Sequence, residues 1–365
     1  MPIPYRADQV GSLLRPAALL EARAARASGR LAADALREVE DREILSALDL
    51  QREAGVDVLS DGEFRRESFI AGMAEAVEGF VADRVVFEWR GPGGGREEAK
   101  ARVVGGKLRQ TRRLTAREAG FLRGHAGGPY KITVPSPSGF VITSYKPGVT
   151  DRHYPTRADL LGDLVPIVRD EIAALAAEGV PYIQLDAPQY SFYLDARARE
   201  RLGRAGLDPD QACAAAVAAD TACLAGVTRD GVTLALHICR GNSQSRWYAE
   251  GGYEPIAERL FASLPADRFL LEYDSERAGD FAPLRFVPRG RTVVLGLVST
   301  KEARLESPDE LRRRIDEAAR YVPLEQLALS PQCGFASVAA GNLLSADDQR
   351  RKLALVAETA RKVWG

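Results

Sequence analysis

The chain has 365 residues, with 50 Lys and Arg against 51 Asp and Glu and only three His, so its formal net charge is -1. This balance provides neither the basic surface expected of a nucleic-acid binder nor an acidic tail. Hydrophobic residues make up 45% and charged residues 28%, which is ordinary for a globular protein, and the length fits two average domains or one large α/β barrel.

The chain shows no sign of export or of membrane insertion. Its first ten residues, MPIPYRADQV, have no apolar core and no cleavage-site pattern, so we expect no secretory signal. The most apolar stretch, 211–227, is short and contains Asp220, which favours a buried helix over a membrane span. Four cysteines are too few for a disulfide framework in a chain of this length. We therefore expect a cytoplasmic protein that binds neither membrane nor nucleic acid; its oligomeric state is not readable from the sequence.

Eight short aliphatic or β-branched runs occur along the chain, and helix-period segments separate most of them. The predicted strands are 7–12, 56–61, 130–135, 181–186, 232–238, 268–273, 292–298 and 326–330. The predicted helices are 16–27 with 33–54, 157–178, 208–226, 253–263, 307–320 and 346–363. Thr156, Ser307 and Ser345 stand where N-caps are expected, and Pro308 follows Ser307.

Regular strand–helix alternation predicts a parallel sheet, and eight repeats predict a (β/α)8 TIM barrel. A doubly wound open sheet is the alternative, but it usually has a glycine-rich turn after its first strand. Here that turn reads Gly-Ser-Leu-Leu-Arg-Pro, with a single glycine. The segment 79–128 breaks the alternation, because a strand-like run at 85–89, a glycine-rich tip at 91–95 and a second polar run follow each other. We predict a β-hairpin insertion between the second helix and the third strand, able to fold over the barrel mouth.

Chemistry-bearing residues gather at the ends of the predicted strands, where the loops of a barrel carry function. His237 and Cys239 are two residues apart and so face the same way on a strand. Glu272 ends the next strand, and Cys333 follows the last one. One His, two Cys and one carboxylate suit Zn²⁺, although each residue alone is more often a buried or hydrogen-bonded side chain.

The remaining Cys and His residues have simpler interpretations. Cys213 and Cys223 lie inside an Ala-rich helix and are expected in the core. His125 and His153 stand in loops without partners at ligand spacing, so we assign them no role.

The pattern of His237, Cys239, Glu272 and Cys333 resembles the C-terminal catalytic barrel of cobalamin-independent methionine synthase. The resemblance extends in order to Gly11-Ser12, Asp61-Gly62-Glu63 and Gln184-Leu185-Asp186, and so spans essentially the whole chain. The strings HICRGN, LEYDSERAGDFAPL and LSPQCGF are typical of the short, single-barrel branch of methyltetrahydropteroyltriglutamate–homocysteine methyltransferase-like proteins. The resemblance implies one zinc-binding barrel domain over residues 1–365.

The resemblance also implies roles for single residues. His237, Cys239, Glu272 and Cys333 would bind zinc. Glu63 and Asp186 match carboxylates that hold the amino group of homocysteine, and Ser12 matches a position that contacts the carboxylate of that substrate.

The expected reaction is methyl transfer to a thiol, as in methionine biosynthesis. A free thiol has a pKa of about 8.5, and the thiolate is the nucleophile. Coordination to zinc deprotonates the thiol, and a shell with two Cys thiolates keeps a zinc-bound substrate thiolate reactive. The chain is therefore expected to be a zinc-dependent S-methyltransferase with homocysteine as its small-molecule thiol substrate.

Two departures from the family pattern leave the methyl donor open. Full-length members carry a second, N-terminal barrel that helps to bind the folate, and this chain has one barrel's worth of residues. Three classes of donor therefore stay open: a folate, a methylated corrinoid protein or a different electrophile. Full-length members also place a proton-donating His after the seventh strand, where this chain has Lys301. An ordinary Lys, with a pKa of about 10.4, is a poor acid for that task, and a solvated loop charge is as good an interpretation.

Two other functions compete with this prediction. A related branch transfers coenzyme M, a sulfonated thiol, to epoxides, and the sulfonate would need cations such as Arg65, Arg66, Lys131 and Arg240. Retention of both Glu63 and Asp186 favours an amino-acid thiol instead. The other alternative is a non-catalytic zinc-binding barrel that has lost its donor site.

Overall fold

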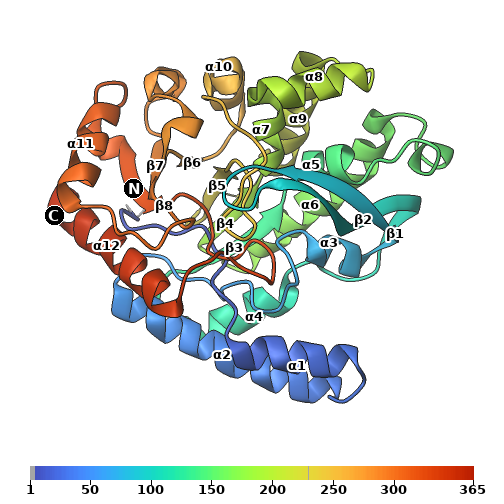
Figure 1. The fold of residues 1–365 in the computed structure, drawn as a ribbon, viewed down its shortest axis with the longest axis horizontal. Coiled ribbons are helices and arrows are strands. Elements are labelled where there is room, and N and C mark those ends of the chain that lie inside the picture. Colours follow the sequence, from blue (N-terminus) through green and yellow to red (C-terminus); the bar gives the residue numbers. More distant parts are fainter. Residues whose placement is uncertain (1–4, 229) are drawn as a thin grey trace.

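The computed structural model describes residues 5–228 and 230–365 and has a mixed α/β fold around a parallel sheet (Figure 1). Six strands pair in the order β3-β4-β5-β6-β7-β8, so each strand lies beside its neighbour in the chain. The strands are β3 (Lys131–Pro135), β4 (Tyr182–Asp186), β5 (Thr233–Ile238), β6 (Arg268–Glu272), β7 (Thr292–Val298) and β8 (Leu327–Pro331). The predicted parallel sheet with intervening helices is confirmed.

The two N-terminal segments predicted as strands do not form full strands. Each makes one isolated parallel bridge, Ala7 with Leu329 of β8 and Leu59 with Tyr130 beside β3. Side chains take the place of ladder partners: Asp57 Oδ2 accepts from the backbone N–H groups of Arg6 and Ala7, at 2.6 and 2.8 Å. The Asp57 carboxylate thus takes two N–H groups of the first segment, and the prediction of full strands at 7–12 and 56–61 is wrong in extent.

Backbone hydrogen bonds nevertheless run from one edge of the sheet to the other through these segments. Asp8 N donates to Leu329 O at 2.9 Å, Asp57 N to Ala7 O at 2.8 Å, and Leu59 N to Pro129 O at 2.9 Å. One buried apolar cluster also joins both segments to five of the strands; it contains Tyr5, Val10, Val58, Tyr182, Ala235, Leu270, Val294 and Ala328. Both observations support the barrel arrangement of the predicted fold.

The helices that cover the outside of the sheet follow the predicted alternation. Those that match predicted helices are α1 (Ala17–Ala27), α2 (Ala33–Ala54), α6 (Arg157–Ala177), α9 (Pro209–Leu224), α10 (Glu254–Ser263), α11 (Pro308–Ala318) and α12 (Ala346–Trp364). Thr156 and Ser345 form capping boxes with Asp159 and Asp348, and Ser307 accepts from the N–H of Glu310. The capping residues named from the sequence therefore begin three of these helices.

Shorter helices occur where the sequence pattern predicted none. They are α3 (Ala71–Ala76), α4 (Ala116–His125), α5 (Pro137–Thr143), α7 (Ser191–Leu194) and α8 (Ala196–Arg204). The 3-10 turns are η1 (Thr150–Arg152), η2 (Pro188–Tyr190), η3 (Glu276–Ala278), η4 (Ala282–Phe286) and η5 (Leu324–Gln326). Most are too short to show a 3.6-residue period, which is why hydrophobic spacing does not reveal them.

The inserted hairpin is present and crosses the front of the sheet in Figure 1. It consists of β1 (Val77–Trp89) and β2 (Gly95–Gln110), paired antiparallel, and α4 follows inside the predicted insertion. Its tip is bound to the loop after β5, because Arg90 N donates to Trp247 O at 2.6 Å and Trp247 N donates to Arg90 O at 3.2 Å. These bonds hold the hairpin against a loop at the C-terminal end of the sheet, where it was predicted to fold.

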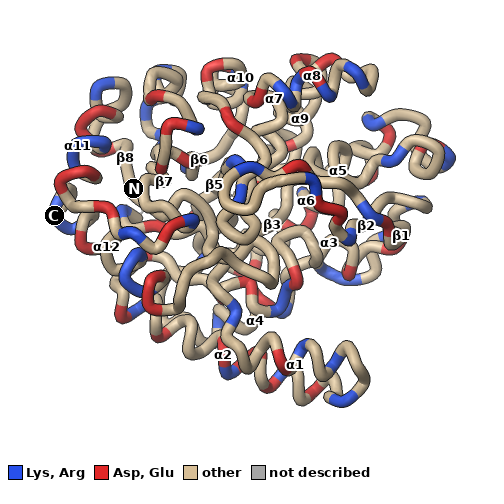
Figure 2. Tube along the Cα trace, in the orientation of Figure 1, with Lys and Arg blue, Asp and Glu red and all other residues tan. Residues whose placement is uncertain are grey.

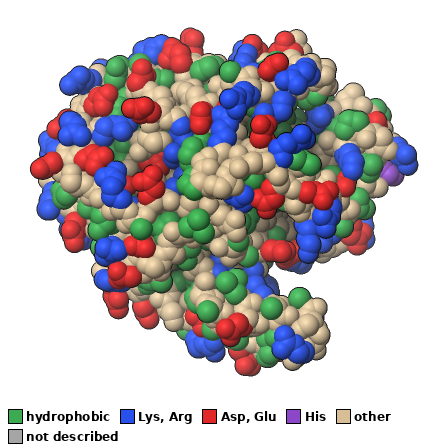
Figure 3. All heavy atoms as spheres, viewed as in Figure 1, with side chains coloured by type: hydrophobic (Ala, Val, Ile, Leu, Met, Phe, Trp, Pro, Cys, Tyr) green, Lys and Arg blue, Asp and Glu red, His purple; other side chains and the backbone are tan. Residues whose placement is uncertain are grey.

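Charged side chains lie mainly on helices, loops and the hairpin, while the central strands are largely uncharged (Figure 2). On the face seen in Figure 3, positive and negative side chains are interspersed. Among the described residues, no helix is long and apolar enough to cross a membrane.

Candidate metal and thiol site

Three of the four predicted metal ligands come together at the C-terminal rim of the sheet, by which we mean the ends of β3 to β8 and the loops that follow them. The ligand atoms of His237, Cys239 and Cys333 all lie within 4.8 Å of one another, and all three residues are buried. His237 Nε2 lies 3.6 Å from Cys333 Sγ, and its Nδ1 lies 3.2 Å from the backbone oxygen of Leu270. A backbone acceptor on one ring nitrogen orients the imidazole and leaves the other nitrogen for a ligand.

The two thiols of this group shift each other's pKa, and His237 acts on Cys239 as well. Hydrogen bonds from Cys333 and His237 hold the pKa of Cys239 well below its ordinary value. The pKa of Cys333 is raised, first because of its hydrogen bond with Cys239 and then because of burial. One thiolate beside one thiol is therefore the favoured state of the pair, and a thiolate is the form in which Cys binds metals.

Glu272, the fourth predicted ligand, lies outside this group. Its carboxylate is fully buried, with Oε2 accepting from the backbone N–H of Arg240 and Oε1 from Arg277 Nε, both at 2.7 Å. Burial opposes its ionisation, but Arg277, Lys301 and Arg240 outweigh burial and hold the pKa of Glu272 below its ordinary value. These contacts favour the ionised form of Glu272, which lies near the three clustered residues and accepts one hydrogen bond on each oxygen.

The two carboxylates predicted to bind the substrate amine lie at the same rim. Asp186 is the register partner of His237 on the adjacent strand, and its Oδ1 accepts from Gln184 Nε2 at 2.8 Å. Burial first, and then the nearby Glu63 carboxylate, raise the pKa of Asp186 to about 7, although His237 opposes the shift. Such groups ionise readily when a cation arrives.

Glu63 lies in a tight turn with left-handed backbone, at φ 57°. Its Oε1 accepts from Thr133 Oγ1 at 2.9 Å, whereas its buried Oε2 has no hydrogen-bond partner among the described residues. Asp61 Oδ2, two residues earlier, is also buried and has no hydrogen-bond partner among the described residues. Burial raises the pKa of Asp61 to about 6. Buried acceptors without a donor are costly, so these oxygens suit a ligand that brings its own N–H groups.

Ser12 is buried beside the Cys333 loop. Its backbone oxygen accepts from the N–H of Phe335 at 2.8 Å, and a Cβ added to Gly334 would lie only 1.9 Å from Ser12 Oγ. Only glycine at position 334 therefore allows the Ser12 hydroxyl to approach the residue that follows Cys333.

Lys301 is not the solvated loop charge allowed for in the sequence analysis. It is buried, and its Nζ donates to Gly241 O and Asn242 Oδ1 at 2.8 Å and to Arg246 O at 3.2 Å. Burial lowers its pKa, although Glu272 opposes the shift. Because an ammonium has three donors and all three are used, Lys301 is best described as a residue that anchors the loop after β5.

Sequence reasoning missed a row of aromatic rings that reaches the thiols through Tyr248. Rings of Phe87 and Trp89 from the hairpin, Tyr248 from the loop after β5 and Phe192 of α7 follow one another with centroid separations of 5.5, 5.9 and 5.1 Å. Tyr248 is close enough to Cys239 and Cys333 that both thiols contribute to its raised pKa, after burial. These four residues come from three separate segments, so no local spacing could have grouped them.

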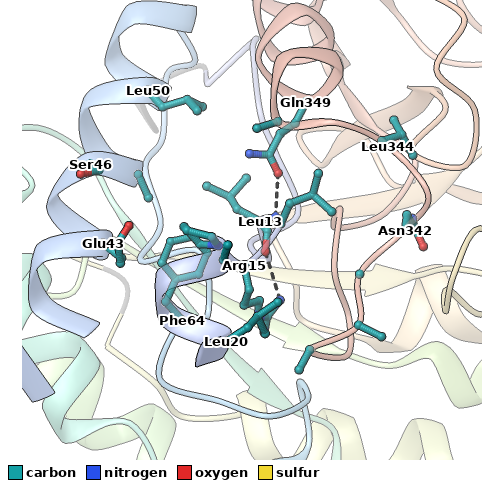
Figure 4. Close-up of a pocket in the computed structure, with 18 residues that line it drawn as sticks. Leu13, Arg15, Leu20, Glu43, Ser46, Leu50, Phe64, Asn342, Leu344 and Gln349 are labelled. Atoms are coloured by element: carbon teal, nitrogen blue, oxygen red, sulfur yellow. Dashed lines mark hydrogen bonds between the residues drawn. The ribbon is translucent and has the colours of Figure 1, made fainter. Parts of the chain in front are cut away.

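A separate cavity of about 400 Å³ lies between α1, α2 and the loop before α12 (Figure 4). Leucines and alanines line most of it, and the bonds from Leu14 N to Gln349 Oε1 (2.7 Å) and from Arg15 Nη1 to Leu13 O (3.1 Å) hold its wall. None of the predicted metal or substrate residues lines it. The predicted site residues therefore lie at the buried rim and not in this cavity.

The parallel sheet, the clustered His and Cys residues and the carboxylates beside them define a chain of the methionine synthase type. It belongs to the family described as "Cobalamin-independent synthase, Catalytic domain", whose model matches residues 6–354. Membership of that family makes the chain a methyltransferase.

Individual relatives agree with this assignment. "Uncharacterized protein YxjH" of Bacillus subtilis is 40% identical over 369 residues, covering 99% of this chain and 95% of that protein. "Methionine synthase" of Pyrococcus abyssi is 26% identical over 326 residues, covering 89% of this chain and 85% of that protein. A structure from Listeria monocytogenes, described as a candidate vitamin-B12 independent methionine synthase, has a TM-score of 0.76 at 28% identity and covers 100% of this chain and 99% of its own.

Proposed function

We propose that this protein is a zinc-dependent S-methyltransferase that accepts a thiol, homocysteine above all, in the manner of a methionine synthase. The observation that carries the proposal is the approach of His237, Cys239 and Cys333 within 4.8 Å of one another. The name of the Pyrococcus abyssi relative supports the same substrate.

The donor set suits zinc. One imidazole with an oriented free nitrogen and two neighbouring sulfurs, all buried, are typical ligands of this ion. Glu272 would be the fourth ligand: its two oxygens accept from Arg277 and from the Arg240 N–H, and each oxygen keeps a further lone pair. When bound, zinc supplies a Lewis acid that lowers the pKa of a substrate thiol from about 8.5 and makes the thiolate available at neutral pH.

The protein's own residues would bind and orient the amino acid. The unpartnered Oε2 of Glu63 and the carboxylate of Asp186 would accept hydrogen bonds from the substrate ammonium. Ser12, beside Gly334, would donate to the substrate carboxylate. The aromatic stack of Phe87, Trp89, Tyr248 and Phe192 would exclude water from the sulfur.

The sulfonate alternative fits less well, because the cations it would need are already engaged. Lys131 Nζ donates to Asp8 and Gln184, and Arg66 donates to Glu118 and Thr133. Arg65 pairs with Glu40 and Asp41, and Arg240 donates to Gly251 O. These contacts favour an amino-acid thiol over coenzyme M.

A donor panel tests the proposal. Zinc-loaded protein is given homocysteine with methyl-folates of different glutamate number, methylcobalamin or an epoxide, and methionine is measured. Formation of methionine from a folate or the corrinoid supports the proposal and identifies the donor. If homocysteine and other thiols leave the X-ray absorption spectrum of the bound zinc unchanged, the result supports a non-catalytic zinc-binding barrel instead. If product forms from the epoxide alone, the result supports an epoxide-dependent thiol alkyltransferase.

A further inference from the structure

An ion pair that the proposed chemistry does not use is buried at the start of β3. Lys131 Nζ lies 2.7 Å from Asp8 Oδ1, and both side chains are fully buried. Apolar side chains fill the interior of most barrels, and a buried ion pair is often no more stabilising than apolar residues of similar volume. Stability alone therefore does not account for these two charges.

Neutralising Asp8 does not account for Lys131 either, because Asp8 has other partners. Its Oδ2 accepts from Tyr182 Oη at 2.8 Å and lies 3.5 Å from Arg268 Nε, and its Oδ1 accepts from the backbone N–H of Gln9 at 2.8 Å. A second cation and two further donors thus face this carboxylate without Lys131.

The ammonium of Lys131 has a further partner on the next strand. Besides Asp8 Oδ1 and the backbone oxygen of Gln9, Nζ donates to Gln184 Oε1, at 2.8 Å. An ammonium has three donors and no acceptor, so all of its donors are used, and the atom that Gln184 presents to it has to be the amide oxygen. Lys131 therefore fixes one end of the Gln184 amide.

The other end of this amide reaches the proposed substrate site. Gln184 Nε2 donates to Val10 O at 2.6 Å and to Asp186 Oδ1 at 2.8 Å. Gln184 and Asp186 are two residues apart on β4, so both side chains lie on the same side of the strand. Among the described residues, Gln184 is the one that donates a hydrogen bond to the Asp186 carboxylate, and Oδ2 is left for a ligand.

The contacts form one chain from the buried ion pair to the rim: Asp8, Lys131, Gln184, Asp186. Without Lys131 the amide oxygen of Gln184 would lose its donor in a buried place, which is costly. The amide would then turn or shift to find another donor, and the hydrogen bond that orients Asp186 would be disturbed.

We infer that Lys131 is a positioning residue for substrate binding, which fixes Gln184 and, through it, the Asp186 carboxylate. The inference rests on the proposed role of Asp186 as an acceptor for the substrate ammonium. Lys131 touches no substrate itself, so its effect is confined to thiols that carry an amino group. This role differs from the sulfonate contact that the coenzyme M alternative would require of the same residue.

The variant Lys131→Met tests the inference, because it keeps an unbranched side chain and removes the donors. Steady-state kinetics are measured with homocysteine, and γ-mercaptobutyrate, the same thiol acid without the amino group, is used as a competitive inhibitor. The KM for homocysteine should rise about 3–10-fold, the usual contribution of one hydrogen bond, with kcat nearly unchanged. The inhibition constant of γ-mercaptobutyrate should stay at its wild-type value.

A matched control is Lys352→Met, because Lys352 is also a fully buried Lys paired with a carboxylate. Its Nζ lies 3.3 Å from Glu306 Oε2, and it belongs to α12, which carries none of the proposed site residues. Lys352→Met should lose stability in urea unfolding, as Lys131→Met does, and keep the wild-type KM for homocysteine.

A double variant tests whether Lys131 acts through Asp186. Lys131→Met/Asp186→Asn should raise the KM for homocysteine no further than Asp186→Asn alone, because the group that Lys131 orients is then already altered. Circular dichroism checks folding. If Lys131→Met does not fold, Asp8→Asn/Lys131→Met removes both charges together and should show the same KM change.

An unchanged KM for homocysteine in the folded Lys131 variants would overturn the inference. Equal weakening of homocysteine and γ-mercaptobutyrate, or additive effects of Lys131→Met and Asp186→Asn, would also overturn it, because they would show that Lys131 does not act through the amino-group site. Failure of the proposed function is distinguishable, because the wild type itself would then form no methionine from homocysteine with any donor.

Discussion

Helix α9 and the rim of the sheet each bury two cysteines and one aspartate, but the two regions treat these groups differently. In α9, burial raises the pKa of Cys213 to about 11 and that of Cys223 still further, and Asp220 has a pKa raised to about 7. At the rim, Asp186 also has a pKa of about 7, yet the pKa of Cys239 is well below its ordinary value. Burial alone therefore does not decide how a thiol behaves.

The difference lies in the partners that each region supplies. Cys223 Sγ is 3.7 Å from the backbone oxygen of Val165, an acceptor that stabilises only the protonated thiol. Cys239 has His237 and Cys333 as neighbours, which can donate hydrogen bonds to a thiolate. Asp220 is likewise satisfied by Ser136 and Tyr190, at 2.7 and 2.9 Å, whereas Asp186 has a single bond from Gln184. Burial keeps both thiols of the helix neutral, whereas at the rim the neighbours of Cys239 stabilise its thiolate.

The largest expected difference between the two regions is in metal binding. Cys239→Ser and Cys333→Ser should each lower zinc affinity by more than about 100-fold, because even groups that only orient ligands contribute about 10–100-fold. Cys213→Ser and Cys223→Ser should keep one zinc per chain. Metal analysis after dialysis measures the zinc content of the rim variants and of the helix variants, with circular dichroism as the folding control. Retained stoichiometric zinc in both rim variants would refute the ligand assignment.

A smaller difference is expected between substitutions of the rim aspartate, Asp186, and of the helix aspartate, Asp220. Asp186→Asn should raise the KM for homocysteine by about 10–100-fold, because one charged hydrogen bond to the substrate ammonium contributes about 1.5–3 kcal/mol. With a pKa of about 7, Asp186 loses its charge as the pH falls, so kcat/KM of the wild type should decline below pH 7 and that of Asp186→Asn should not decline with this pKa. Steady-state kinetics from pH 6 to 8 measure this, and identical profiles would exclude Asp186 from substrate binding.

Asp220→Asn should instead affect stability. An amide nitrogen would face the hydroxyl donors of Ser136 or Tyr190, so we expect a loss of about 1–3 kcal/mol in the free energy of unfolding, with zinc content unchanged. The pKa of Asp220 in the folded protein, about 7, lies above the unfolded value of about 3.9, so its stabilisation is full below pH 4 and is lost as the pH rises through 7.

The destabilisation by Asp220→Asn should accordingly be larger at pH 5 than at pH 8. Urea unfolding at both pH values measures it. An equal loss at the two pH values would show that Asp220 does not titrate in this range.

The smallest effect is expected for conservative changes in the helix. Cys223→Ala removes one sulfur atom from a packed site and should lower the free energy of unfolding by about 1 kcal/mol, with no change in metal affinity or methyl transfer. Thermal unfolding and zinc titration test this. A loss of zinc in this variant would mean that the contrast between the two regions is mistaken.

Much of the site could be predicted because strand geometry is local. The two-residue spacing of His237 and Cys239 directs both side chains to one side of β5, and parallel strands bring their C-terminal ends together, which gathers Cys333 and Asp186 at the same rim. Caps such as Thr156 are local as well and were predicted correctly. The positions of the cysteines in the sequence also distinguish Cys213 and Cys223, inside a predicted helix, from Cys239 and Cys333, at predicted strand ends.

The hydrogen-bond partners of the buried charged side chains depend on the tertiary structure. The position of Glu272 at a strand end predicts a metal ligand, and the folded chain adds two partners that the sequence does not reveal, Arg277 and the Arg240 N–H, which donate to its carboxylate. In the sequence Lys301 has the character of a solvated loop charge. In the folded chain its ammonium donates to three acceptors from the loop after β5.

The two N-terminal segments show the same dependence. They have the composition of strands, yet Asp57, which lies about fifty positions away in the chain, takes the hydrogen bonds of Arg6 and Ala7. Periodicity determines which way a side chain points, so the sequence by itself determined the alternation of strands and helices and the rim at which chemistry gathers. Which donor meets which acceptor depends on segments distant in the chain, and only the tertiary structure decided it.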